Sequence, residues 1–352
     1  MPTLTAFHAA RHYPADARCG DAPAGMHVAD SFGDVAAEYD ALSTRAGLVD
    51  RSDRGRVVVT GADRARWLSG LVTNVVQTLD SGSGNYAFAL DPRGRVVFDV
   101  IILAVGEALW LDVDGEVVAA ALKHLDRYLF SESVRLADAS AEDARLAVYG
   151  PSAVDVARAL GNTNFAALPA LGHLLVGPDV RLVRNDLGRV PGFELIVPRE
   201  QAAAWWDRLV EAGAQPAGWQ AFHALRIEAG VPWLGLDIDE QVLPPETGQI
   251  ERGISLSKGC FVGYEILERM RSRGALARRL VGLRAEGGGA LAAGDVLRQG
   301  GGVVGRVTSV ARHPRTGRWI GLGYLKTGLP SHDGIVAGES GQSVVIVPLP
   351  AA

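Results

Sequence analysis

The sequence predicts an α+β protein that ends in a small β-barrel. Strand-like and helix-like patterns alternate from about residue 33 to residue 229 and form two successive mixed blocks. After Arg279 the pattern changes to short Val- and Leu-rich runs, separated by the glycine triplets 287–289 and 300–302. The chain has 352 residues, 48% of them hydrophobic, which is enough material for two or three cores.

The first block is predicted to span residues 31–145, after an N-terminal extension of residues 1–30 that shows little periodicity. Its last helix repeats apolar residues at the spacing of an amphipathic helix. The expected elements are a helix at 33–45, a strand at 56–60, a helix at 63–72, strands at 85–90, 95–103 and 108–113, and a helix at 116–130.

The second block is predicted to span residues 146–275, and the barrel residues 276–352. Two blocks of the same kind suggest related α+β domains, although their sequences are not similar enough to define a repeat. The expected elements are strands near 145–149, 173–185 and 193–197, helices at 152–160, 200–212 and 218–229, and barrel strands at 279–284, 303–310, 318–325 and 342–348.

Composition excludes several classes of protein. The net charge is -5 and no long run of Lys or Arg occurs, so no bulk affinity for nucleic acid or anionic membrane is indicated. The two cysteines, Cys19 and Cys260, rule out a disulfide framework and a metal site made from cysteine alone. The first thirty residues have no apolar core like that of a signal peptide, and no segment of 18 apolar residues occurs. We therefore expect a soluble cytoplasmic protein without a metal site.

The hairpin around Asp91–Gly94 carries the first candidate site. If its loop has two residues, paired positions sum to 185, which sets Tyr86 directly opposite Asp99. Alternation puts Asp99 on an apolar face, where burial would raise its pKa and suit it to accept a proton or hold a cationic nitrogen. The alternative is an edge carboxylate that points into water. A register slip of one residue would turn Asp99 to the other face.

A second candidate is the segment Ser257–Glu265, which contains Lys258 and Cys260 just before a predicted helix. A helix N-terminus and a neighbouring lysine both lower the pKa of a thiol and so favour the reactive thiolate. The alternative is a small apolar residue that fills a turn. Two further residues lie in apolar surroundings: Glu194 on a strand and Arg226 on a helix. Each could belong to a structural ion pair or could bind a polar heterocycle.

Several of these residues resemble the motifs of a known protein family. The run Lys258-Gly259-Cys260-Phe261-Val262-Gly263, followed by Glu265, resembles the signature of the YgfZ folate-binding proteins, with Tyr264 where that family usually has Gln. Over residues 30 to 345 the chain is similar to the wider superfamily of glycine-cleavage T-proteins, which are aminomethyltransferases. The resemblance implies two related ferredoxin-like α+β domains around a central cleft, plus a C-terminal β-barrel.

The resemblance also implies a function. Tetrahydrofolate, or a one-carbon derivative, would bind among Tyr86, Asp99, Glu194 and Arg226, and Cys260 would act with Lys258 near the cleft mouth. Catalytic roles would then fall to Cys260, Asp99 and Lys258. The expected function is that of a folate-binding accessory protein for iron-sulfur enzymes, which include a tRNA-modifying enzyme. Its partners would be these client enzymes, without direct contact to nucleic acid or membrane.

Two alternatives stay open. The first is a folate-dependent aminomethyl or one-carbon transferase, which the presence of Asp99 favours. Phe98 and Phe222 count against it, because T-proteins have an aspartate and an arginine at these positions. The second is an interaction module with a vestigial folate cleft, in which the arginines of residues 269–279 form a docking face.

Overall fold

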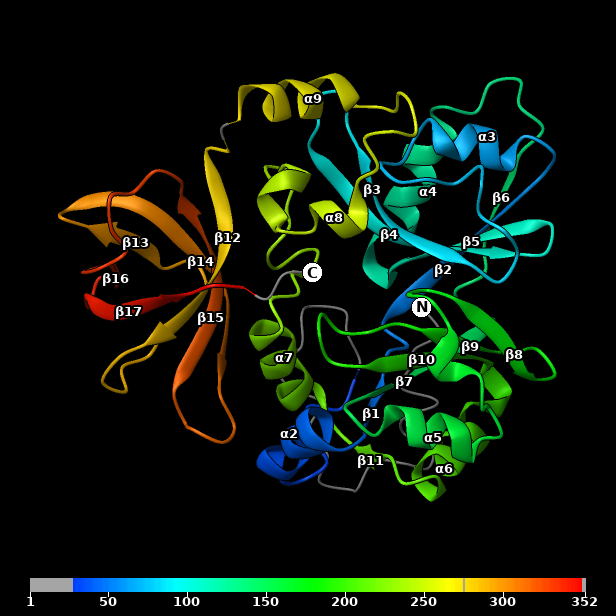
Figure 1. The fold of residues 1–352 in the computed structure, drawn as a ribbon, viewed down its shortest axis with the longest axis horizontal. Helices are drawn as coiled ribbons and strands as arrows, with labels where there is room; N and C mark the ends of the chain where they lie inside the picture. Colours follow the sequence, from blue (N-terminus) through cyan, green and yellow to red (C-terminus); the bar gives the residue numbers. More distant parts are fainter. Residues whose placement is uncertain (1–27, 275, 350–352) are drawn as a thin grey trace.

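The computed structural model describes residues 28–274 and 276–349. The predicted N-terminal extension therefore lies almost wholly outside the described residues, as does Cys19. Within the described part, two sheets lie one above the other and the barrel stands beside them (Figure 1). The predicted α+β fold with a C-terminal barrel is confirmed.

The first sheet has five strands in the order β3-β4-β5-β2-β6. Its interior strand β4 is buried on both faces, because Phe98, Val100 and Ile102 enter one core and Ile101 and Leu103 enter another. Its elements are β2 (Arg54–Thr60), α3 (Arg64–Ser69), β3 (Gly84–Leu90), β4 (Val96–Val105), β5 (Ala108–Asp114), η1 (Gly115–Val117), α4 (Val118–Asp126) and β6 (Arg135–Asp138).

The second sheet has six strands in the order β11-β1-β7-β10-β9-β8. Strand β1 comes before the whole first sheet in the sequence, yet it pairs with β7 and β11. The predicted boundary at residue 145 therefore does not describe two contiguous units. The elements are α2 (Val35–Thr44), β1 (Gly47–Asp50), β7 (Asp143–Tyr149), α5 (Ala153–Ala159), η2 (Phe165–Ala167), β8 (His173–Gly177), β9 (Val180–Arg184), β10 (Gly192–Pro198), η3 (Arg199–Gln201), α6 (Ala202–Glu211), β11 (Gln215–Pro216) and α7 (Trp219–Glu228).

The C-terminal strands close into a barrel of six, in the order β12-β15-β14-β13-β16-β17. The four predicted strands are present, and two more occur that are too short to show alternation in the sequence. The strands are β12 (Arg278–Ala285), β13 (Val296–Gln299), β14 (Gly302–Arg312), β15 (Trp319–Lys326), β16 (Val336–Ala337) and β17 (Gln342–Val347).

The segment between α7 and the barrel runs along the first sheet (Figure 1). It contains η4 (Pro244–Thr247), α8 (Ile250–Gly253) and α9 (Tyr264–Arg273). Helix α8 packs closely on β3, because Gly253 has no side chain: a Cβ there would lie 2.9 Å from the ring of Phe88. Among the described residues, no helix is long and apolar enough to cross a membrane.

Candidate functional site

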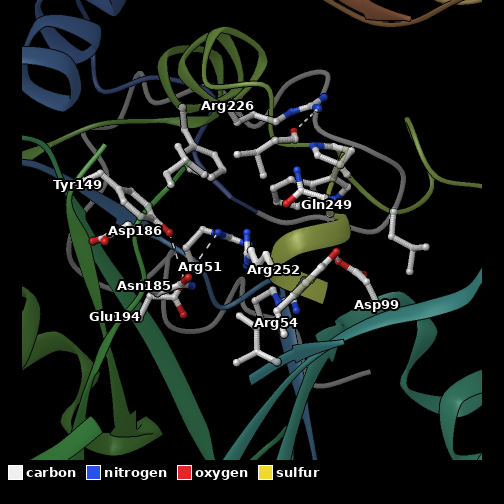
Figure 2. Close-up of a pocket in the computed structure, with 18 residues that line it drawn as sticks. Arg51, Arg54, Asp99, Tyr149, Asn185, Asp186, Glu194, Arg226, Gln249 and Arg252 are labelled. Atoms are coloured by element: carbon white, nitrogen blue, oxygen red, sulfur yellow. Dashed lines mark hydrogen bonds and ion pairs between the residues drawn. The ribbon is translucent and has the colours of Figure 1, made fainter. Parts of the chain in front are cut away.

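Several charged side chains line a cleft between the two sheets. The cleft has a narrow inner chamber of about 80 Å³ and a wider outer chamber of about 350 Å³. The outer chamber has space for a small organic ligand. Figure 2 shows the inner chamber, with Asp99 and Glu194 on opposite sides and Arg51, Arg54 and Arg252 between them. Six residues border both chambers: Tyr86, Asn185, Asp186, Val231, Gln249 and Arg252.

Tyr86 and Asp99 form the first wall of the inner chamber, but not in the predicted register. Asp99 pairs with Phe88, and Tyr86 pairs with Ile101. The reason is that the turn is longer than predicted, with Leu90 paired to Val96, and a β-bulge between Ala89 and Leu90 shifts the register by one more residue. The direct pairing of Tyr86 with Asp99 is therefore wrong by two residues. A shift of two keeps both side chains on one face.

The Tyr86 hydroxyl accordingly donates to Oδ2 of Asp99 at 3.0 Å. Asp99 is only 9% exposed and lies on an interior strand, so the interpretation as an edge carboxylate in water is wrong. Its other oxygen, Oδ1, is buried and accepts no hydrogen bond from any residue that the structure describes. Burial, and then the charge of Asp99, raise the pKa of Tyr86 well above its ordinary value. Tyr86 therefore stays a proton donor at neutral pH.

Glu194 is the corresponding carboxylate of the second wall, on β10. Its Oε1 accepts hydrogen bonds from the Tyr149 hydroxyl at 3.1 Å and from the Asn185 amide at 3.0 Å. Guanidinium nitrogens of Arg51 and Arg145 each lie 3.9 Å from one of its oxygens. This surrounding of donors and positive charge fixes the position of the Glu194 carboxylate.

Arg51 and Arg54 line the chamber and were missed by the sequence analysis. Arg51 pairs with Asp53 at 3.0 Å, and its guanidinium lies 5.0 Å from the ring centre of Phe222 and 4.9 Å from that of Trp233. Arg54 pairs with Asp112 at 2.7 Å. The dense charges of residues 50–54 were a signal, but such a run more often marks a solvated surface.

Arg226 borders the chamber, yet protein partners occupy its guanidinium. The side chain is fully buried and pairs with Asp237. It also donates to Oγ of Ser309 at 2.6 Å and to the carbonyl of Val231 at 3.2 Å. Ser309 belongs to β14, so Arg226 ties helix α7 to the barrel. The structure supports the ion-pair interpretation of this residue.

Cys260 and Lys258 lie apart from this cluster and border neither chamber. The thiol of Cys260 is exposed. The ammonium group of Lys258 donates to the carbonyl of Ser69 at the end of α3 and lies 5.1 Å from the ring centre of Phe261. Burial lowers the pKa of Lys258 to about 8. The structure therefore assembles Tyr86, Asp99 and Glu194 in one chamber, borders it with Arg226, and leaves the Lys-Gly-Cys loop outside.

No group of three or more His, Cys, Asp or Glu side chains in the described part of the chain is placed to hold a metal ion. The chemistry that the inner chamber offers is instead that of two buried carboxylates, two tyrosine hydroxyls and several guanidinium groups. Such a set can hold a polar heterocycle and move a proton.

Comparison with known proteins assigns both parts of the chain. The GCVT N-terminal domain matches residues 4–258, and the glycine cleavage T-protein C-terminal barrel domain matches residues 278–347. The chain is 35% identical over 331 residues to an aminomethyltransferase of Rubrobacter xylanophilus, covering 93% of this chain and 88% of that protein. It is 33% identical over 325 residues to an aminomethyltransferase of Geobacillus kaustophilus, covering 88% of each.

A solved structure agrees with the fold. The glycine cleavage system aminomethyltransferase T from Bartonella henselae superposes with a TM-score of 0.79, covering 90% of this chain and 89% of that chain. Its sequence identity to this chain is 22%, so this likeness concerns the fold alone.

Proposed function

Because this chain belongs to the glycine-cleavage T-protein family, with both its GCVT N-terminal domain and its C-terminal barrel, we propose that it is a folate-dependent one-carbon transferase of the aminomethyltransferase type. The observation that carries the proposal is the inner chamber, in which two buried carboxylates face each other from different sheets. The relatives named above as aminomethyltransferases favour this function over the iron-sulfur role expected from the Lys-Gly-Cys motif.

The chamber suits a reduced folate. Glu194 can accept the N–H groups of a pterin-like ring, and Tyr149 and Asn185 hold its carboxylate in place for that contact. The unpartnered oxygen Oδ1 of Asp99 needs a donor, which a ligand nitrogen would supply. When bound, the reduced folate would supply the nitrogen that takes up the one-carbon group.

Asp99 is the proposed proton acceptor. Its free oxygen can take a proton or a hydrogen bond from the reacting nitrogen, while the Tyr86 hydroxyl holds the other oxygen and so sets the direction of the carboxylate. The burial of both residues excludes water from their contact. Arg226 differs from our first expectation in this proposal: it keeps the wall in place through Asp237 and Ser309, and does not bind folate itself.

A second candidate function rests on a separate observation, the exposed thiol of Cys260 outside both chambers. An accessory protein for iron-sulfur client enzymes would bind folate in the same cleft and engage its client at this thiol. One cysteine cannot hold a cluster alone, so the client would supply the other ligands.

The test is calorimetric titration with tetrahydrofolate, combined with an assay of one-carbon transfer. We expect wild-type affinity in the micromolar range or tighter, about -8 kcal/mol, weaker binding in Glu194→Gln, and lost transfer in Asp99→Asn. Absence of binding to wild-type protein would contradict the proposed function. Binding without transfer, together with a client-enzyme defect specific to Cys260→Ala, would favour the accessory role.

A further inference from the structure

One positive charge in the cleft has no counterion. Four arginines among the described residues line the inner chamber, and three of them pair with a buried aspartate: Arg51 with Asp53, Arg54 with Asp112 and Arg226 with Asp237. Arg252 is the exception. Within the described ranges, neither an ion pair nor a hydrogen bond holds its guanidinium, which can therefore bind a ligand.

The fold places this cation beside the proposed reacting group. Helix α8 lies on β3 at Gly253, so the guanidinium of the preceding Arg252 lies over the ring of Tyr86, 4.2 Å from its centre. The hydroxyl of the same ring donates to Asp99, whose Oδ1 stays without a donor. Arg252 is half-buried and borders both chambers, so a ligand that enters through the outer chamber passes it.

A free acceptor and a free cation flank Tyr86, and together they fit a small zwitterion. Resting on the proposed function, we propose that the amine substrate that this cleft binds beside folate carries a carboxylate, as a short N-alkyl amino acid does. Its carboxylate pairs with the guanidinium of Arg252, and its nitrogen lies at Oδ1 of Asp99. A guanidinium binds a carboxylate through two parallel hydrogen bonds.

The charge balance selects a carboxylate over a phosphate. Among the described residues that line this chamber, Arg252 is the one cation without an ion pair, and the carboxylates of Asp99 and Glu194 face the same chamber. A dianion would bring a second negative charge that these carboxylates repel, while a zwitterion sets its carboxylate against Arg252 and its nitrogen against Asp99 and leaves the net charge of the site unchanged.

The experiment titrates N-methylglycine and its uncharged amide into the full-length protein saturated with tetrahydrofolate. In wild type we expect N-methylglycine to bind at least tenfold more tightly than the amide. In Arg252→Gln this preference disappears, because the affinity for N-methylglycine falls at least tenfold while the affinity for the amide is unchanged. Arg252→Lys restores part of the loss, and Glu251→Gln, which changes the neighbouring exposed charge, serves as the matched control. Equal binding of the two probes to wild type, or no binding of either, would overturn the proposal.

A second titration separates this role from a contact between Arg252 and the folate itself. Tetrahydrofolate carries a glutamate, whereas 6-methyltetrahydropterin has the ring alone. If Arg252→Gln weakens tetrahydrofolate but not 6-methyltetrahydropterin, Arg252 serves the folate glutamate and the inference is wrong. Failure of the proposed function looks different: wild type would bind neither folate nor pterin. Arg252-dependent binding of N-methylglycine to the unloaded protein would then still support the carboxylate site.

Discussion

Each wall of the inner chamber has a tyrosine hydroxyl that donates to a carboxylate, but the two carboxylates differ in their other partners. On the first wall the Tyr86 hydroxyl donates to Asp99 at 3.0 Å, and on the second wall the Tyr149 hydroxyl donates to Glu194 at 3.1 Å. Asp99 has no further protein donor and keeps one oxygen free. Glu194 also accepts from Asn185 and lies 3.9 Å from a guanidinium nitrogen of Arg51.

This difference separates binding from chemistry. A carboxylate surrounded by donors and positive charge is held in one orientation, which suits the recognition of a ligand. A buried carboxylate with one free oxygen can still take a proton, which suits catalysis. The same Tyr–carboxylate pair therefore predicts a binding residue on the second wall and a proton acceptor on the first.

The strongest test of this division is Asp99→Asn. An amide of the same size cannot accept the proton, so one-carbon transfer should fall by roughly 10²- to 10⁴-fold. Tetrahydrofolate affinity should change by less than about tenfold, the equivalent of about 1.4 kcal/mol. Steady-state kinetics and calorimetry on the same preparation check both values. Full turnover in this variant would remove Asp99 from the mechanism.

Glu194→Gln should show the opposite pattern. Loss of the charge removes hydrogen bonds worth about 1.5–3 kcal/mol, so tetrahydrofolate should bind about ten- to a hundredfold more weakly. Turnover at saturating folate should stay within a few-fold of wild type. An equal loss of affinity in Asp99→Asn would mean that the two walls do not differ in role.

The two tyrosines sharpen the comparison further. Tyr86→Phe leaves Asp99 without any protein donor and should lower turnover by about tenfold, from a lost hydrogen bond of about 1–2 kcal/mol. Tyr149→Phe should have a smaller effect, seen in folate affinity, because Asn185 still holds Glu194. Kinetics and titration of the two variants in parallel decide the point. Identical responses would contradict the division of roles.

The smallest expected effect concerns the buried carboxyl group of Asp114 and the pH dependence of stability that it causes. Burial raises the pKa of Asp114 from 3.8 to about 6, and the nearby charge of Asp53 adds to this against the opposing effect of Arg54. The folded protein therefore holds a proton that the unfolded chain releases between these two values. This contribution to stability is complete below pH 3.8 and is lost as the pH rises to 6.

Asp114→Asn tests this pH dependence, since asparagine can still cap the following turn. Its melting temperature should match that of wild type near pH 4, exceed it increasingly up to pH 6, and stay higher above pH 6. Thermal unfolding followed by circular dichroism at several pH values gives the curve. A constant difference across this range would show that the ionisation of Asp114 does not matter.

Sequence patterns predicted the helices and strands of this molecule more completely than the residues that line its cleft. The four long barrel strands and the main strands of both sheets follow from apolar alternation and from glycine-rich turns. The register of β3 against β4 did not follow, because a bulge after Ala89 leaves no sign in the residue pattern. Asp99 still faced the chamber, since the shift was two residues and side chains alternate with a period of two.

The residues missed by the sequence analysis gain their roles only from tertiary contacts. Arg51 gains its place in the chamber because β1 joins the second sheet, a pairing that no local pattern predicts. Arg252 lies in a short helix of four residues, and its closeness to Tyr86 depends on the packing of α8 on β3. The roles of Cys260 and Lys258 stay predictions, since both lie outside the chambers.

The pairing of β1 also governs how this chain can reach its native state. Gly47 must find Tyr149 on one side and Gln215 on the other, so the whole first sheet lies within the loop that these contacts close. Contacts between residues so distant in the sequence carry a large entropic cost and slow the folding of a domain. During synthesis, β11 becomes available only after most of the chain has emerged. The cleft, whose second wall depends on that sheet, should therefore form as one of the last events of folding.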